Sequence, residues 1–525
     1  MKRVLCLSIA LLGTACTKEK PAAPPAKAPS AAPLPPTGLA AWQPPTGVPA
    51  QLPLLNVKGL DAFGFPNQLP DKVALLALLR SRQYEPLTKF IEQMADEIDK
   101  DPRKELWMFV AMNAFYQAAP DLHPLLDEWV QRHPTSFAPW SARSHYLFAV
   151  AAEARGDKPS SDTKEAQFAA MQAFNEKAAA DLAKALELRP GVVENIRWRT
   201  KVAMFKGDVD PRRILEDGRK VCKDCLTLYQ GIMAMLRPQW GGSYEQMDAL
   251  AEEALASSTN PAMKVLRGAS HNERCDKALN KERFEEALAA CDKSLEAGRW
   301  YQYLITRADL HAKMKEPEKG LPFLNEALEQ WPQDAEALGM RAAFLRKMGR
   351  WEEARNDVLL GAYVKDNEGY VKWERWQVMR EILKVAGEKY KAKDWKAAED
   401  LYDQALRVQP DDPEPWFWRG MTFKQRDMVD AAFGDFQEAV KHTRKWLMAY
   451  KELSIALVKR DQAKDAVELW NGFIADNPQD AEAVYLRGGV YNRLGDLQHA
   501  KADAQRACEM KFDKACKVLA EQKLE

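Results

Sequence analysis

Residues 413–444 constrain the fold of this chain more than any other stretch. Large and small side chains recur there at helical spacing. They are Trp416, Gly420 and Phe423 in the first half, and Ala432, Phe436 and Ala439 in the second. The small residues predict two antiparallel helices that approach closely, with the aromatic rings filling the gaps around them. Such a hairpin buries one face internally and needs a neighbour for the other, so it predicts a stack of similar hairpins.

The same spacing recurs about every 34 residues from residue 268 to the end of the chain, with about ten extra residues at 367–378. This pattern resembles the tetratricopeptide repeat (TPR). About seven repeats are expected over residues 266–525, closed by a capping helix at 511–522. The expected fold class is all-α: an α-solenoid of helical hairpins with a regular TPR superhelix in the C-terminal half.

Residues 55–265 predict a second, less regular helical (TPR-like) domain. Its motifs are Leu236-Arg237-Pro238 followed by Trp240-Gly241-Gly242-Ser243, and further upstream His133-Pro134-Thr135-Ser136 and Ala154-Arg155-Gly156. From about residue 70 to residue 260 the pattern resembles a bacterial domain of unknown function found in TPR-containing proteins. The resemblance implies a helical fold and no chemistry. We expect Trp240 to pack onto the helices around its glycine turn, and Ser243 to cap the helix that follows.

The N-terminus has the features of an export signal. Lys2 and Arg3 precede a short apolar run at 4–12, and small residues lead into Cys16. This resembles a bacterial lipoprotein signal, which implies that residues 1–15 are removed and that Cys16 is lipid-modified. The alternative is an ordinary secretory signal with an incidental cysteine. By resemblance to Gram-negative lipoproteins, Thr17 favours the outer membrane, with the protein lipid-anchored and facing the periplasm.

Residues 16–54 are rich in alanine and proline: eleven of the 31 prolines of the chain fall between residues 18 and 53. A segment of this composition has too few large apolar residues to form a core. We therefore expect an extended tether that holds the folded body away from the membrane.

Six cysteines remain after Cys6 and Cys16 are set aside. Cys275 and Cys291 fall at facing positions of one predicted hairpin, close enough to form a disulfide. Cys508 and Cys516 resemble the cysteine staple of Sel1-like helical repeats, which implies a second disulfide. The Cys222/Cys225 pair is a third disulfide candidate, with a redox-active dithiol and a metal site as alternatives.

The chain contains no motif that indicates an enzyme, a cofactor or a metal site. Lys and Arg total 76, as do Asp and Glu, so no basic excess indicates nucleic-acid binding. The seven histidines are scattered along the sequence, and we expect surface or capping roles for them. We therefore expect a non-enzymatic protein, with an enzyme site near Trp240 and Cys222/Cys225 as the less favoured alternative.

We expect the function to be that of a protein-binding scaffold in the bacterial cell envelope. First-helix residues that face away from the partner helix would line a concave groove for a peptide or helix of an envelope protein. These residues are Gln302, Ile305, Asp309, Arg346, Phe417, Met421, Lys424, Lys451, Ile455, Tyr485 and Asn492. The alternative is a structural or assembly subunit that binds through its convex side or its edges. The membrane would be contacted through the lipid anchor only.

Overall fold

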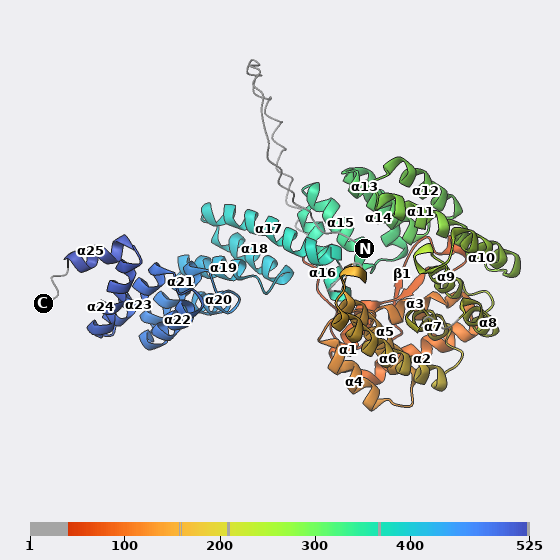
Figure 1. The fold of residues 1–525 in the computed structure, drawn as a ribbon, viewed down its shortest axis with the longest axis horizontal. Coiled ribbons are helices and arrows are strands. Elements are labelled where there is room, and N and C mark those ends of the chain that lie inside the picture. Colours follow the sequence, from red (N-terminus) through yellow and green to blue (C-terminus); the bar gives the residue numbers. More distant parts are fainter. Residues whose placement is uncertain (1–39, 157, 159, 207–209, 366–368, 522–525) are drawn as a thin grey trace, which may run out of the picture. The chain divides into compact units, whose positions relative to one another are not determined.

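The computed structural model describes residues 40–156, 158, 160–206, 210–365 and 369–521. Cys16 and most of the expected tether lie outside these residues. The chain divides into two compact units, residues 1–372 and 373–525, which we call unit 1 and unit 2. In Figure 1, unit 1 runs from red to green and unit 2 from cyan to blue. Most of the described residues are helical, so the all-α prediction is confirmed.

Unit 1 contains one two-stranded sheet, sixteen α-helices and five short 3-10 helices in the residues described. The strands are β1 (Leu54–Asn56) and β2 (Gln68–Pro70), which pair antiparallel. The helices of the irregular part are α1 (Lys72–Arg80), α2 (Tyr84–Lys100), α3 (Leu106–Asn113), α4 (Leu122–Arg132), α5 (Phe137–Arg155), α6 (Glu165–Leu188), α7 (Val193–Lys206), α8 (Pro211–Val221), α9 (Leu226–Met235) and α10 (Tyr244–Ser257). The first repeats follow as α11 (Ala269–Leu279), α12 (Phe284–Ala297), α13 (Tyr301–Lys313), α14 (Pro317–Gln330), α15 (Ala335–Lys347) and α16 (Trp351–Lys365).

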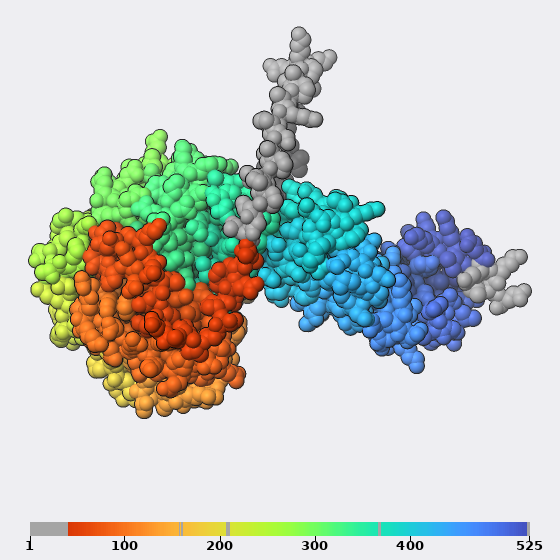
Figure 2. Space-filling model, turned by 180° about the vertical axis from the view of Figure 1, so that it is seen from behind, coloured from red at the N-terminus to blue at the C-terminus, as the bar shows by residue number. Residues whose placement is uncertain are grey.

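The segment before α1 packs against the first repeats of unit 1. The Lys58 backbone N–H donates to the Glu329 carbonyl at 3.0 Å, and the Phe63 and Trp300 rings meet edge-on at 5.1 Å. At the start of α1, the Lys72 N–H donates to Gln333 Oε1 at 2.7 Å. Figure 2 shows the red N-terminal residues lying against green residues of the repeats. The expected boundary between residues 265 and 266 therefore falls inside one compact unit.

The last part of the expected tether is not free of the body. The Trp42 N–H donates to Asn356 Oδ1 at 3.1 Å, and the Trp42 ring meets the Tyr363 ring at 5.5 Å. Both partners lie on α16. An aromatic residue in a proline-rich segment gains free energy by covering an exposed ring. Trp42 therefore fixes the end of the expected tether to α16.

Unit 2 contains the remaining repeats. Its helices are α17 (Gly369–Lys391), which begins in unit 1, α18 (Trp395–Val408), α19 (Pro413–Gln425), α20 (Val429–Lys441), α21 (Leu447–Lys459), α22 (Ala463–Asp476), α23 (Ala481–Arg493), α24 (Leu497–Glu509) and α25 (Asp513–Glu521). The close approach expected in the α19–α20 hairpin is present, since a Cβ on Gly420 would lie 2.8 Å from the Phe436 ring. Through α11–α24 the helices follow one another as seven pairs, with α25 after the last.

The turn between the two helices of each repeat contains one left-handed residue. Glycine occupies this position at Gly349 and Gly495, with φ of 76° and 78°. Ordinary residues occupy it at Glu282, Lys315, Lys393, Asp427 and Asp461, with φ between 57° and 62°. A side chain with a Cβ is strained in this region. The turn geometry is therefore imposed by the packing of the two helices at these five positions.

Buried arginine–aspartate pairs join the helices within and between repeats. Arg419 on α19 donates two hydrogen bonds to Asp435 on α20, at 2.7 and 2.8 Å, and one to Asp403 on α18. Each aspartate is 16 residues away from the arginine. Arg341 and Arg487 repeat the arrangement, each with an aspartate 16 residues after it and an asparagine 16 residues before it. We call this set the arginine ladder.

The irregular part of unit 1 contains the same arrangement. Arg143 on α5 donates two hydrogen bonds to Asp181 on α6 and one to Asp127 on α4. Asp181 lies 38 residues after Arg143, because α5 and α6 are long and a loop separates them. The Trp140 indole also donates to the Pro134 carbonyl at 3.0 Å, as the Trp416 indole does to the Pro410 carbonyl at 2.8 Å. Helices α4–α6 are thus a TPR-like unit with an insertion.

Candidate protein-binding surface

The first helices of successive repeats in unit 2 share one face, which is defined by ion pairs. These pairs are Arg380–Glu414 between α17 and α19, Lys424–Glu452 between α19 and α21, and Lys451–Glu482 between α21 and α23. The Lys424 and Glu452 atoms are 2.6 Å apart, and those of Lys451 and Glu482 are 3.5 Å apart. We call this side the first-helix face.

Two exposed tryptophans extend the first-helix face along α17. Trp373 and Trp376 precede Arg380 by seven and four residues, which places all three on one side of the helix. The two side chains are 61% and 46% exposed, and their rings are 6.2 Å apart. The Arg380 guanidinium lies 6.0 Å from the Trp376 ring centre. Such a large exposed aromatic patch is typical of a contact surface.

Helix α21 contributes a second apolar patch to the first-helix face. Met448 and Ile455 are exposed and lie three residues before and four residues after Lys451, on the same side of the helix. Ile455, which was predicted to line the groove, is thus accessible to a partner. Met448 was missed, although its spacing from Ile455 is a signal available in the sequence.

Phe417 is buried, contrary to the expectation that it lines an open groove. Its side chain is fully covered, and its ring lies 4.5 Å from that of Trp446 and 6.0 Å from that of Phe436. Trp446 immediately precedes α21 and packs over the end of the preceding hairpin. Phe417 is therefore part of the core of unit 2, not of its accessible surface.

The other predicted residues of unit 2 differ in accessibility. Met421 is half-buried against this core, and Tyr485 is half-buried with its ring 5.3 Å from that of Phe512. Asn492 is exposed. Lys424 and Lys451 are exposed in part, and each is in one of the ion pairs that define the first-helix face.

Four predicted groove residues belong to unit 1. Ile305 is buried, Arg346 is half-buried and Gln302 is exposed. Asp309 accepts a hydrogen bond of 2.6 Å from the Tyr370 hydroxyl. Among the described first helices of both units, the exposed large apolar residues are those of unit 2, so we place the candidate surface there.

The three expected cysteine pairs are disulfide-bonded in the structure. The Cα atoms are 5.5 Å apart in Cys222–Cys225, 5.2 Å in Cys275–Cys291 and 4.8 Å in Cys508–Cys516. The second pair lies in a buried cluster between α11 and α12. The third connects α24 to the capping helix α25. No group of three or more His, Cys, Asp or Glu residues that could hold a metal ion is found in the described part of the chain.

Trp240 does not pack onto the surrounding helices as expected. Its side chain is 57% exposed. The turn itself forms as expected: Gly241 has a φ of 89°, and the Ser243 hydroxyl accepts the Gln246 N–H at 3.2 Å. The short 3-10 turn Pro238–Trp240, between α9 and α10, leaves the indole exposed to solvent.

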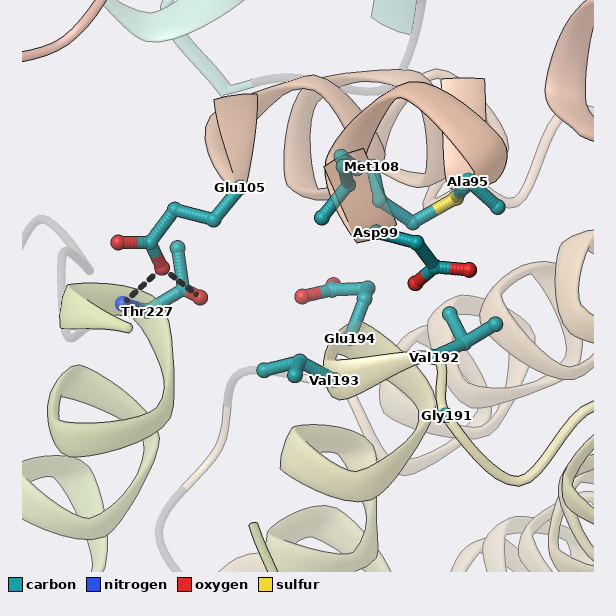
Figure 3. A pocket seen from close by; sticks show the side chains of 10 residues that line it. Ala95, Asp99, Glu105, Met108, Gly191, Val192, Val193, Glu194 and Thr227 are labelled. Atoms are coloured by element: carbon teal, nitrogen blue, oxygen red, sulfur yellow. Dashed lines mark hydrogen bonds between the residues drawn. The ribbon is translucent and has the colours of Figure 1, made fainter. Parts of the chain in front are cut away.

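A small pocket lies in unit 1 between α2, α3, α7 and α9 (Figure 3). Its volume of about 20 Å³ is enough for one water molecule and too small for a substrate. Glu105 lies at its edge and accepts hydrogen bonds from the N–H groups of Leu226 and Thr227, at 2.7 and 2.9 Å, and from the Thr227 hydroxyl. Burial raises the pKa of Glu105 to about 7 despite these donors.

Glu194 lines the same pocket and is held differently. Burial opposes its ionisation, but Arg197 and His145 together outweigh burial and lower the pKa of Glu194 to about 2. Its oxygens also accept the Trp198 indole N–H at 2.6 Å. His145, expected near the surface, is buried 3.5 Å from Glu194, and burial lowers its pKa. These partners tie the helices together and leave little room for a ligand.

None of the helices in the described ranges has both the length and the apolar content needed to cross a bilayer.

Two families match separate parts of the chain. Residues 72–206 match a domain of unknown function, DUF4034. Residues 305–369, 387–445 and 452–511 match the tetratricopeptide repeat. The first match confirms part of the resemblance inferred for residues 70–260, although the Trp240-Gly241-Gly242-Ser243 motif lies outside it. The second confirms the TPR repeats of the C-terminal half.

The relatives are TPR proteins of low identity. The chain is 24% identical over 202 residues to the Hsp70-Hsp90 organizing protein of Triticum aestivum, which covers 38% of this chain and 33% of that protein. It is 32% identical over 101 residues to the small glutamine-rich tetratricopeptide repeat-containing protein 2 of Mycosarcoma maydis, covering 19% of this chain and 29% of that protein. The chain thus spans about a third of the length of these relatives.

Among solved structures, the TPR domain of P58(IPK) is 12% identical and covers 83% of this chain and 99% of its own, with a TM-score of 0.22. A likeness at that score carries no argument about arrangement. The repeats and the TPR-protein relatives together point to a protein–protein interaction scaffold.

Proposed function

We propose that this protein is a lipid-anchored scaffold of the bacterial cell envelope that binds a partner protein on the first-helix face of unit 2. Cys16 would carry the lipid, and the outer membrane, on its periplasmic side, would be the location. The observation that carries the binding proposal is the exposed pair Trp373 and Trp376. A folded protein gains by burying such rings, and tryptophans are enriched among residues that dominate binding energy.

The partner segment would be amphipathic. Its apolar side would cover Trp373, Trp376, Met448 and Ile455, while its polar side would meet the ion pairs between the helices. A peptide or a helix with apolar residues spaced along one side fits this description.

The test is a comparison of two double variants of the full chain. Trp373→Ala/Trp376→Ala removes the aromatic patch. Val429→Ala/Leu497→Ala is the matched control, because these side chains are comparably exposed but lie on second helices, α20 and α24. All four are surface positions, so the fold should be retained in both variants. Far-UV circular dichroism checks this.

A photo-crosslinking residue at position 376 should capture a partner from intact cells, and the same residue at position 497 should not. The partner identified by mass spectrometry should bind the tryptophan double variant at least about 30-fold more weakly, as expected for the loss of a binding hot spot. Equal binding to both double variants would refute the first-helix face as the binding surface.

A role as an assembly subunit that binds through an edge remains the second candidate, and the exposed Trp240 favours it. Trp240→Ala would then weaken complex formation while the Trp373→Ala/Trp376→Ala variant would not. The lipid anchor is tested separately: Cys16→Ser should move the protein from the membrane fraction to the soluble periplasmic fraction, and unchanged membrane association would contradict lipidation.

A further inference from the structure

The Cys222–Cys225 disulfide lies at the junction of two helices. Cys222 ends α8 as its C-terminal cap, and Cys225 is the N-terminal cap of α9. The two residues differ in accessibility: Cys225 is fully buried, whereas Cys222 is half-buried between the exposed residues Val221 and Lys223. Cys222 is therefore the residue of this pair that an incoming thiolate can approach.

This disulfide contributes less to chain stability than the other two. Its cysteines are three residues apart, against eight for Cys508–Cys516 and 16 for Cys275–Cys291. In the chain-entropy account, the stabilisation grows with the logarithm of loop length, so the factor by which the disulfide disfavours the unfolded state is roughly ninefold smaller for Cys222–Cys225 than for Cys275–Cys291. Reduction of Cys222–Cys225 therefore costs the fold least.

Other bonds hold the junction when the disulfide opens. Glu105 caps the first two N–H groups of α9 independently of the cysteines. Between the cysteines, the carbonyl of Asp224 accepts the Asn260 amide at 2.7 Å, and its carboxylate accepts the Thr259 hydroxyl at 3.1 Å. The reduced thiols would thus remain close together, ready to form the disulfide again.

The leaving group of an exchange reaction is also favourably placed. Attack at Cys222 releases Cys225 as a thiolate, and Cys225 lies at the N-terminus of α9, where the helix dipole favours a negative charge. Burial of Cys225 and the Glu105 carboxyl on the same N–H groups oppose this effect. The buried Cys275–Cys291 pair offers neither an accessible sulfur nor a terminal thiolate.

We infer that Cys222–Cys225 is a thiol–disulfide exchange site that accepts two electrons from a protein dithiol, while the buried Cys275–Cys291 disulfide is structural. A thiolate of the partner attacks the Cys222 sulfur, the bond between the two cysteines breaks, and Cys225 leaves as a thiolate. The second partner thiolate then attacks the mixed disulfide at the partner's sulfur and releases Cys222. The partner gains a disulfide, and its two protons pass through solvent to Cys222 and Cys225.

The first test equilibrates the full oxidised chain with reduced and oxidised glutathione at a series of ratios. Alkylation followed by mass spectrometry then reports each cysteine pair separately. Cys222–Cys225 should be half-reduced at a potential at least about 30 mV less negative than that of Cys275–Cys291, a tenfold difference in the equilibrium constant. Its reduction should leave the circular dichroism spectrum unchanged. Reduction of all three pairs together, or of Cys222–Cys225 last, would overturn the inference.

The second test uses matched single variants and oxidised glutathione as the probe. In Cys225→Ser, Cys222 should form a mixed disulfide rapidly. In Cys222→Ser, the buried Cys225 should react at least about tenfold more slowly, because only thiolates exposed to solvent undergo exchange readily. Equal rates in two folded variants would contradict the assigned roles. If either variant fails to fold, the measurement on the unmodified chain still decides the question.

Discussion

Replacement of Arg419 by methionine tests whether the arginine ladder stabilises the stack of repeats. Methionine keeps an unbranched apolar stem of similar reach and removes the guanidinium group. Three hydrogen bonds are lost, two to Asp435 and one to Asp403. The ring of Trp416, 4.8 Å from the guanidinium carbon, loses its cation as well.

The magnitude follows from how far each partner is buried. The Asp435 side chain is only 7% exposed, so the loss of Arg419 leaves a buried carboxylate without its partner, which costs about 3–5 kcal/mol. Asp403 is 41% exposed, and its bond is worth about 0.2–1 kcal/mol. The contact with Trp416 adds about 0.5–1 kcal/mol. We expect a total loss of about 4–7 kcal/mol.

Hydrogen exchange measured by mass spectrometry on the full chain is the assay, because it reports opening of α19 and α20 separately from the rest. The double variant Arg419→Met/Asp435→Asn should recover at least about 2 kcal/mol, since the amide carries no charge to desolvate. Lys441→Met is the control, because its exposed pair with Glu438 on α20 should be worth less than about 0.5 kcal/mol. A loss below about 1 kcal/mol for Arg419→Met, or no recovery in the double variant, would refute the reasoning.

Three further predictions concern single features of the fold. The pKa of Glu105 is about 7 in the folded state, so the folded state holds its proton more tightly than the unfolded chain does. Protonated Glu105 therefore stabilises the fold fully below about pH 4.5, and this stabilisation is lost as the pH rises through about 7. Urea unfolding at pH 5 and pH 8 should show this loss, about 3 kcal/mol at most, in the unmodified chain and not in Glu105→Gln. Asp427→Gly should raise stability by about 0.5–1 kcal/mol because Asp427 is left-handed, whereas Gly495→Ala should lower it by about 1 kcal/mol, both measured by thermal unfolding. Removal of the buried disulfide in Cys275→Ala/Cys291→Ala should cost about 2–4 kcal/mol by urea unfolding, and no shift in midpoint would contradict its structural role.

The sequence predicts those features that depend on contacts within one repeat. The small and large positions around Gly420 and Phe436 follow from the packing of two neighbouring helices, and the spacing of Cys275 and Cys291 follows from the same hairpin. Both are set by local periodicity, which can be read along the chain. The helical fold and the Cys275–Cys291 pairing could therefore be predicted.

Contacts between repeats and between distant segments could not be predicted in the same way. The burial of Phe417 depends on Trp446, which comes from the start of the next repeat and has no fixed place in the pattern. The contact of Trp42 with Tyr363 joins segments more than 300 residues apart. In both cases an aromatic ring covers a surface that the periodicity leaves open, and periodicity alone does not show which ring does so.

The arrangement around Arg143 shows why the repeats of the irregular part of unit 1 are harder to predict from the sequence than the regular repeats. Arg143 makes the same kinds of contact as Arg419, but the aspartate that follows it in the sequence, Asp181, is 38 residues away instead of 16. A search at fixed spacing finds Asp127 before Arg143 and misses Asp181 after it. The three-dimensional arrangement is the same, so the insertion changed the length of the helices and not the way in which they are joined.

The charged residues that stabilise this fold are buried, whereas those that can bind a partner are partly exposed. Asp435 and Asp181 are almost fully buried, so no partner can take over their arginines without opening the repeat. Lys424 and Lys451 on the first-helix face are in ion pairs that remain partly exposed, and such pairs are worth about 0–1 kcal/mol. An incoming carboxylate can therefore replace Glu452 or Glu482 at small cost. The aromatic patch supplies the affinity in this scheme, and the exchangeable ion pairs determine which polar groups the partner carries beside it.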